Sequence, residues 1–287
     1  MRTKLLLTGV VLVGAVFLLV TNVIAAPIYV SSNQGKVGIL DVESATIDVV
    51  ANFDFSNEPT DYANYGLVDI AFDNSGNLYG LTFDTLFGLD LNSGDVRYIN
   101  QFGDSTIGSS THLNALAISD NNVAYAMGAH STSLFTLDLS TGVKTLEFDT
   151  MTDISGGFYS HGDLAFDDQG NLYLAGGEDP QGASSLILLD VEENSATEIG
   201  AIGRKNIYGL AYDNDTMYGM KQNGALFEIP LNPGTGERIG KADNSDIGNI
   251  YGAAVNKANP VPEPATMVLV GFGLLGIAGI RKKISKS

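Results

Sequence analysis

Between residues 27 and 256 the chain alternates short apolar segments with groups of turn-forming residues. The clearest unit starts at Gly66 and contains four apolar segments, separated by Asn-Ser-Gly and similar groups. Segments of this length that are rich in Leu, Val, Ile, Tyr and Phe, and bounded by Gly, Asn, Asp and Ser, are typical of strands joined by tight turns. The pattern therefore predicts four short antiparallel strands in each unit.

The unit recurs with a spacing of 43 to 48 residues, measured between equivalent alanines of its first strand. A repeat in the mid-forties with four strands is typical of a β-propeller blade. Small alanines would suit first strands that crowd around an axis, and the tyrosines of the second strands would fill the space between blades. The alanines are Ala71, Ala117, Ala165, Ala211 and Ala254, and the tyrosines are Tyr29, Tyr79, Tyr125, Tyr173 and Tyr218.

The two ends of the repeat region predict how the ring closes. The pattern begins at Ile28-Tyr29, in a second strand, and finishes with residues 250–255, a first strand without followers. Pairing the two would complete a blade and remove an open sheet edge. The expected fold is therefore all-β: a five-bladed β-propeller over residues 26–259, with four-stranded blades and a split closing blade. An open β-solenoid is the alternative, but solenoid repeats are shorter.

Residues 1–25 have the features of an export signal. Arg2 and Lys4 precede an apolar region at residues 5–20, and small residues around Ala25 suit a cleavage site. We expect an N-terminal signal helix here; an uncleaved anchor is the alternative, because the apolar region is long.

The C-terminal segment, residues 260–287, combines a Pro-Glu-Pro group, an uncharged apolar run at residues 265–280 and a basic cluster. The run predicts a transmembrane helix, slightly short of a full span, with its basic end on the cytoplasmic side. The residues that define this order are Val261, Pro262, Glu263, Pro264, Arg281, Lys282 and Lys283.

This order closely resembles the PEP-CTERM sorting signal of Gram-negative bacteria. The resemblance implies export across the inner membrane and recognition by exosortase. It also implies a precursor anchored transiently or stably by the C-terminal helix, followed by a place on the cell surface or in an extracellular matrix of exopolysaccharide and biofilm. A plain C-terminal anchor is the alternative, but such an anchor does not need Pro-Glu-Pro.

Charge excludes some partners. The 287-residue chain has no cysteine and a formal net charge of −18. Setting aside the six basic residues of the terminal segments leaves 9 basic against 33 acidic residues, or −24. Such a surface repels nucleic acid and anionic lipid. The sequence also lacks phosphate-binding and nucleophile motifs, so we expect no cofactor.

The loops that lead into the first strands open onto one face of a propeller, and they hold the candidate binding residues. Aromatic rings beside Asn and His suit sugars, which present apolar CH patches together with hydroxyls. The candidates are Tyr65, His112, Tyr159, His161, Tyr208 and Tyr251.

Two acids, Asp69 and Asp163, hold one position on the first strand, two residues before the repeat alanine. Paired carboxylates across a pocket could perform acid–base chemistry on a glycosidic bond. The alternative is that each acid accepts hydrogen bonds from turn amides of its own blade.

No metal site is expected. The three histidines lack ligand spacing, and the Asp-Asn-Ser-Gly turn at residues 73–76 lacks the oxygen-ligand spacing of a calcium loop. It is better explained as a hairpin turn.

These features predict an exported surface or matrix protein whose propeller binds polysaccharide or a surface protein without catalysis. A glycoside hydrolase or lyase using Asp69 and Asp163, and a purely structural surface component, are the alternatives.

Overall fold

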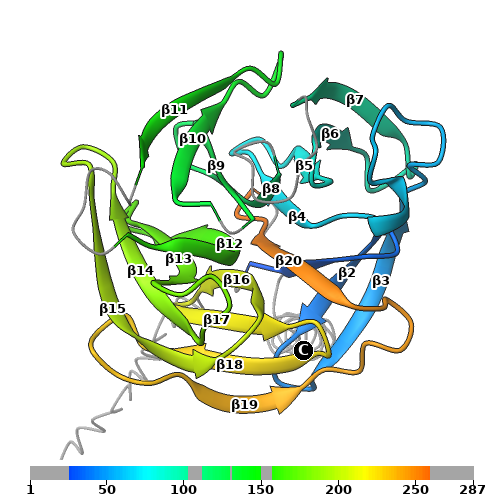
Figure 1. Cartoon of the computed structure of the whole chain (residues 1–287). Helices are drawn as coiled ribbons and strands as arrows, with labels where there is room; N and C mark the ends of the chain where they lie inside the picture. Colours follow the sequence, from blue (N-terminus) through cyan, green and yellow to red (C-terminus); the bar gives the residue numbers. More distant parts are fainter. Residues whose placement is uncertain (1–25, 103–111, 130, 150–156, 259–287) are drawn as a thin grey trace, which may run out of the picture. The chain divides into compact units, whose positions relative to one another are not determined.

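The computed structural model describes residues 26–102, 112–129, 131–149 and 157–258. Within these ranges, 20 strands form five antiparallel sheets of four strands each. The sheets stand around a common centre like the blades of a propeller (Figure 1). The expected all-β, five-bladed propeller with four-stranded blades is confirmed.

Each blade is named here by its innermost strand. The β4 blade contains β4 (Asp69–Phe72), β5 (Leu78–Leu81), β6 (Thr85–Leu89) and β7 (Val96–Gln101). The β8 blade contains β8 (Leu113–Ile118), β9 (Ala124–Gly128), β10 (Ser133–Leu137) and β11 (Lys144–Asp149). The β12 blade contains β12 (Tyr159–Phe166), β13 (Leu172–Gly177), β14 (Ser184–Asp190) and β15 (Ser195–Arg204). The β16 blade contains β16 (Ile207–Asp213), β17 (Thr216–Lys221), β18 (Ala225–Ile229) and β19 (Glu237–Lys241). The closing blade contains β20 (Ile250–Val255), β1 (Ile28–Ser32), β2 (Lys36–Asp41) and β3 (Thr46–Asn52).

The closing blade joins the two ends of the repeat region. Its innermost strand, β20, pairs with β1, so that Ala254 lies opposite Tyr29 and Ala253 opposite Val30. The Asn256 N–H also donates to the Pro27 carbonyl at 3.2 Å. The predicted split blade is therefore present, and the inner strands β4, β8, β12, β16 and β20 each contact the next around the ring.

The alanine–tyrosine repeat of the sequence reflects the register in which the first and second strands of each blade pair. In every blade the repeat alanine of the innermost strand lies directly opposite the repeat tyrosine of the second strand. The small alanine lies on the innermost strand, and the ring opposite it packs in the apolar cluster between neighbouring blades. The five pairs are Ala71–Tyr79, Ala117–Tyr125, Ala165–Tyr173, Ala211–Tyr218 and Ala254–Tyr29.

The core of the described residues divides into five apolar clusters, one between each pair of neighbouring blades. Between the β12 and β16 blades, for example, Tyr173 and Leu186 pack with Leu210 and Phe227. Burying these faces is the main favourable contribution to folding. Residues 26–258 thus form a compact unit that contains its own core.

Alternate connections lie at opposite ends of each blade, because neighbouring strands are antiparallel. Turns between first and second strands, such as residues 73–77, lie on what we call the turn face. The loops that lead into first strands, and the connections between second and third strands, lie on the opposite, mouth face. In the closing blade no turn joins the first strand, β20, to the second, β1. The two ends of the repeat region, at Pro27 and Asn256, lie at that position instead.

The expected signal helix at residues 1–25 and transmembrane helix in residues 260–287 lie outside the described residues. Within the described ranges, no helix has the length and apolar character needed to cross a membrane.

Candidate functional site

Asp69 lies at the start of β4 and is fully buried. Its Oδ1 accepts a hydrogen bond from the Ile70 N–H at 2.7 Å. Its Oδ2 accepts one from the Leu116 N–H, on the neighbouring strand β8, at 2.6 Å. The carboxyl group therefore joins the inner strands of two blades.

Asp163 does the same on β12 and is also fully buried. Its Oδ1 accepts from the Leu164 N–H at 2.6 Å. Its Oδ2 accepts from the Leu210 N–H of β16 at 2.6 Å and from the Ala253 N–H of β20 at 3.1 Å. One carboxyl group thus joins three blades.

The five donors occupy one position of the repeat, the residue immediately before each repeat alanine. An innermost strand has no neighbour on its inner edge, so the N–H groups that face the centre need other acceptors. The four oxygens of Asp69 and Asp163 supply them for all five strands. We call this arrangement the amide ring; its donors are Ile70, Leu116, Leu164, Leu210 and Ala253.

The two acids also hydrogen-bond each other, which requires a shared proton. Burial raises the pKa of Asp69 well above its ordinary value, and the charge of Asp163 adds to the increase. Burial likewise raises the pKa of Asp163, to about 7. Two buried carboxyls in contact cannot both ionise cheaply, so the pair keeps a proton near neutral pH.

The amide ring separates two hollows on the central axis. Toward the mouth face, Val68 and Asn114 line a cavity of about 300 Å³, the mouth cavity. Toward the turn face, Ile70 and Leu116 line a smaller pocket of about 80 Å³. Neither Asp69 nor Asp163 has exposed surface in either hollow. The two carboxyls do converge, as the hydrolase hypothesis requires, but inside the protein and against backbone amides.

One wall of the mouth cavity is a cluster of aromatic rings. Tyr65 is the last residue of a short 3₁₀ helix, η1 (Ala63–Tyr65), and Tyr62 immediately precedes this helix. The Tyr62 ring lies 5.1 Å from His112 and 5.4 Å from Phe83, both in edge-to-face contact. The Tyr62 hydroxyl group is hydrogen-bonded to His112 Nε2. Tyr65 is about half exposed, so its ring is open to solvent.

A second part of the lining is formed by Tyr208 and Tyr251, whose rings lie 5.4 Å apart. Burial raises the pKa of both hydroxyl groups; Tyr251 adds to the increase at Tyr208, and Tyr65 adds to it at Tyr251. These phenols therefore stay neutral at physiological pH. Asn206 and Gln222 add amide groups to the lining.

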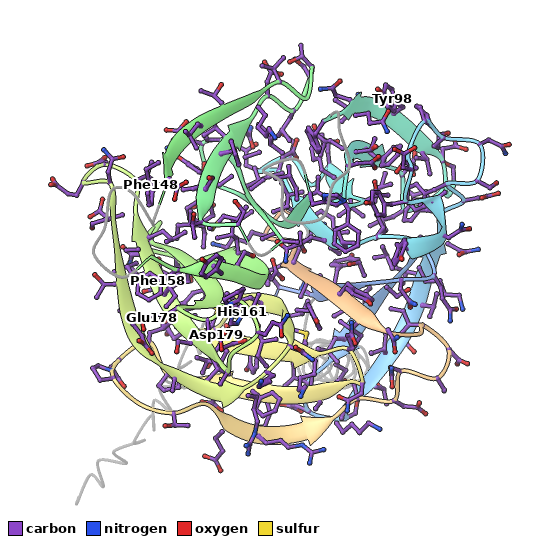
Figure 2. The ribbon with its side chains drawn as sticks, viewed as in Figure 1. Tyr98, Phe148, Phe158, His161, Glu178 and Asp179 are labelled. Atoms are coloured by element: carbon purple, nitrogen blue, oxygen red, sulfur yellow. The ribbon has the colours of Figure 1, made fainter. Side chains whose placement is uncertain are left out.

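His161 is part of the lining and also supports a neighbouring loop. Its Nδ1 is hydrogen-bonded to Ser184 Oγ at 3.1 Å, and its Nε2 to the Asp179 carbonyl at 2.8 Å. Figure 2 shows His161 beside Asp179. His161 thereby holds residues 180–182, which line the cavity between the second and third strands of the β12 blade.

Asp84 plays a similar role on the aromatic wall and is fully buried. It accepts hydrogen bonds from Thr60 Oγ1 at 2.5 Å, the Asp61 N–H at 3.0 Å and Gln101 Nε2 at 2.8 Å. Burial alone would raise the pKa of Asp84, but these hydrogen bonds stabilise the carboxylate and lower it overall. Asp84 therefore fixes the loop that carries Tyr62 and Tyr65.

The comparisons with known proteins locate the sorting signal. Residues 260–283 match the PEP-CTERM protein-sorting motif. The match includes every residue that the sequence analysis assigned to the signal, from Val261 to Lys283. A chain with this sorting motif is an exported protein whose membrane-anchored precursor is processed by exosortase. No curated protein matches the chain.

Solved structures resemble the body in fold. One is a chain of a nidogen–laminin complex, at 10% identity, with a TM-score of 0.50 over 82% of this chain and 99% of that one. A Bacteroides thetaiotaomicron protein of unknown function has 12% identity and a TM-score of 0.49 over 68% of this chain and 54% of that one. Virginiamycin B lyase from Staphylococcus aureus has 12% identity and a TM-score of 0.42 over 79% and 73%. At these identities the likeness extends to the fold alone.

The structure brings together five of the six candidate binding residues, Tyr65, His112, His161, Tyr208 and Tyr251, in the lining of one cavity. Tyr159, the sixth, pairs with Gly177 at the start of β12 and is not part of the lining. The sequence analysis did not identify the residues that the connections between second and third strands contribute, among them Phe83, Gln181 and Gln222. The signal was available, because these connections open onto the same face.

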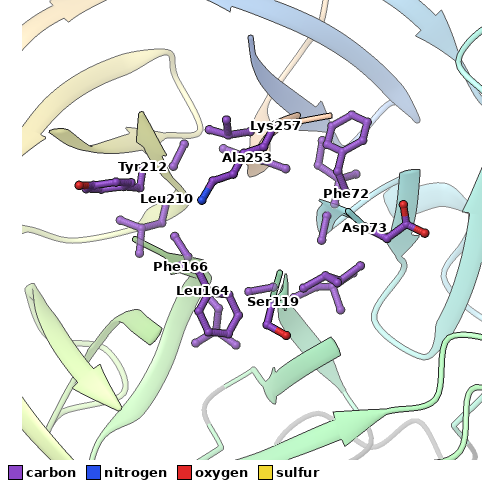
Figure 3. Close-up of a pocket in the computed structure, with 18 of the residues that line it drawn as sticks. Phe72, Asp73, Ser119, Leu164, Phe166, Leu210, Tyr212, Ala253 and Lys257 are labelled. Carbon is purple, nitrogen blue, oxygen red and sulfur yellow. The ribbon is translucent and has the colours of Figure 1, made fainter. Parts of the chain in front are cut away.

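The smaller pocket on the turn face combines apolar side chains with the polar Asp73, Ser119 and Lys257 (Figure 3). It is lined by the repeat alanines and by Leu164 and Leu210. Lys257 reaches over its opening and forms an ion pair with Asp168 at 2.8 Å.

The hairpin-turn interpretation of the Asp-x-x-Gly-Asn segments is confirmed. Asp73 Oδ1 accepts hydrogen bonds from the Ser75 and Asn77 N–H groups at 2.9 and 2.8 Å. Asp167 repeats this arrangement with Gln169 and Asn171. Among the described residues, no group of three or more His, Asp or Glu side chains could hold a metal ion.

Proposed function

We propose that the mature protein is a cell-surface or extracellular-matrix component of a Gram-negative bacterium, whose propeller binds exopolysaccharide without cleaving it. The mouth cavity is the binding site. The observation that carries this proposal is the composition of that cavity, in which aromatic rings from two walls face a lining of Asn, Gln and His side chains. Rings of this kind pack against the CH faces of sugars, while amides bond hydroxyl groups.

The same geometry argues against hydrolysis by Asp69 and Asp163. An acid–base pair must reach the glycosidic oxygen and a water molecule or the anomeric carbon. Both carboxyl groups are closed off from solvent, and all four of their oxygens accept backbone hydrogen bonds. A structural role for the two acids follows from these contacts.

The terminal segments complete the proposal. Residues 1–25 direct export, residues 26–259 form the propeller, and the helix in residues 260–287 holds the precursor in the membrane until exosortase acts near Pro262–Pro264. Binding of a surface protein at the mouth face is the competing function.

The test uses the body, residues 26–260, and the exopolysaccharide of its own host. Co-sedimentation measures binding, and size-exclusion chromatography of the polymer measures its length. We expect retention with unchanged polymer length. Shortening of the polymer that disappears in Asp69→Asn would make the protein an enzyme. No retention at all would leave a protein partner or a structural role.

A further inference from the structure

We infer that the mouth cavity binds the end of a glycan chain, and that the sugar it takes is uncharged. This inference rests on the proposed function and specifies its ligand. It has two independent supports, which are the charge of the lining and the closed floor of the cavity.

The lining is uncharged in a strongly acidic body. None of the residues that line the mouth cavity, within the described part of the chain, is Asp, Glu, Lys or Arg. The ammonium group of Lys205 donates to the Gln181 carbonyl at 2.8 Å, and Lys205 is not part of the lining. Burial keeps the phenols of Tyr208 and Tyr251 protonated. Among the described residues, the lining therefore offers no Lys or Arg side chain to pair with a uronate or a sulfate.

The surroundings disfavour an acidic sugar further. With 9 basic against 32 acidic residues outside the terminal segments, the body creates a negative potential. An anionic polymer would have to approach against this potential and would lose its hydration without gaining an ion pair. A neutral sugar does not meet this cost, because its hydroxyl groups can bond the amides of Asn114, Asn206 and Gln222.

The cavity ends at a floor. Val68 and Asn114 line its lower part, and the amide ring directly below links all five inner strands. A polymer therefore cannot pass through the propeller along its axis. At about 300 Å³ the cavity is at the lower end of the range for ligand sites, so it suits a chain end of one or two sugar rings.

The experiment uses partial hydrolysates of the host exopolysaccharide, separated by anion exchange into neutral and acidic fragments and then by length. Binding to the folded body is measured by titration calorimetry at low and high salt. We expect neutral fragments to bind with a dissociation constant, per mole of chain, that does not change with chain length or salt. Chain-interior binding would instead lower that constant in proportion to length, because longer chains offer more sites.

Matched variants assign the effect to the cavity. Tyr251→Ala should weaken binding of the neutral fragments on the order of tenfold or more, because it removes one aromatic wall. Leu146→Ala, which removes an exposed apolar side chain on the outer strand β11, should not change it. Thermal unfolding of each variant checks that the body is folded.

The possible results are separable. Preferential binding of acidic fragments, or affinity that rises with chain length, overturns the inference while polysaccharide binding stands. Binding that is equal in wild type and Tyr251→Ala overturns the assigned site. Retention of neither polymer nor fragments means that the proposed function itself has failed.

Discussion

At the scale of single residues, the amide ring is where the sequence departs most from a plain repeat. Five equivalent N–H groups point to the centre, yet only two blades carry an acid at the position that can reach them. One carboxyl serves two strands and the other serves three. Two acids in contact are stable there because they share a proton and because five donors stabilise the remaining charge.

The shared proton predicts how stability depends on pH. Both carboxyls have a higher pKa in the folded protein than in the unfolded chain, so the folded state holds more protons. The stabilisation is fully present below the unfolded pKa near 4 and is lost as pH rises through about 7. We expect the free energy of unfolding to fall by about 2 kcal/mol between pH 5 and pH 8. Urea unfolding at several pH values measures it.

In Asp69→Asn the free energy of unfolding should depend less on pH, because an amide at this position cannot share a titrating proton with Asp163. The variant should also be less stable by about 1 to 3 kcal/mol at pH 5, since its NH₂ group cannot accept a backbone hydrogen bond. Asp120→Asn, which removes an exposed carboxyl, is the control for net charge. Equal slopes in Asp69→Asn and wild type would contradict the shared-proton interpretation.

A substitution at Gly252 tests how tightly the protein packs around Asp69. A Cβ at this position would overlap the Asp69 carboxylate and backbone. We expect Gly252→Ala to destabilise the body by about 1 to 3 kcal/mol, measured by thermal or urea unfolding. Gly240→Ala is the matched control, because its Cβ would meet only Ala45 at an ordinary 3.9 Å. A Gly252→Ala variant as stable as Gly240→Ala would show that Asp69 can move.

At the scale of elements, β20 decides whether the ring is closed. It pairs with β1, contacts β4 and β16, and contributes one donor to the amide ring. A body that ends at residue 249 should lose the cooperative unfolding transition and associate through the open edge of β1. A body that ends at residue 258 should unfold cooperatively as a monomer. Analytical ultracentrifugation and urea unfolding distinguish the two, and a monomeric, cooperative 249 variant would contradict this role of β20.

The loop that carries η1 depends on Asp84 in a comparable way. Asp84→Ala removes the acceptor for Thr60, Asp61 and Gln101. We expect faster hydrogen exchange at residues 60–66 and weaker ligand binding at the mouth, with little change in the other blades. Uniformly faster exchange across the body would instead show that Asp84 supports the whole fold.

The elements were predictable from the sequence to a large extent, and the site less so. The spacing of Ala71, Ala117 and their equivalents predicted blade number and closure, because every blade repeats one alanine–tyrosine register. The shared position of Asp69 and Asp163 was visible too, but its meaning depends on the unpaired inner edges of the first strands. Spacing alone does not show which N–H groups those edges present.

At the scale of the whole molecule, the mouth cavity and the two ends of the propeller region lie on opposite faces of the propeller. Pro27 and Asn256 replace a turn on one face, whereas Tyr65 and Tyr251 open onto the other. Changes to the sorting motif should therefore leave the body's binding site untouched. We expect Glu263→Ala to accumulate precursor in the membrane fraction while the melting temperature of the body stays unchanged. Normal release of Glu263→Ala would contradict processing at this motif.

The pairing of β1 with β20 also sets an order of events during biogenesis. During translocation β1 would be the first strand of the propeller to cross the membrane. It cannot pair on its inner side until β20, the last strand, has also crossed. Since long-range pairing of this kind forms late, the chain stays open, and thus threadable, until residue 255 has crossed. The sorting motif, at residues 260–283, follows directly. We therefore expect the ring to close only when the processing signal reaches the membrane, and a chain cut short before β20 to be left with an unpaired edge on β1.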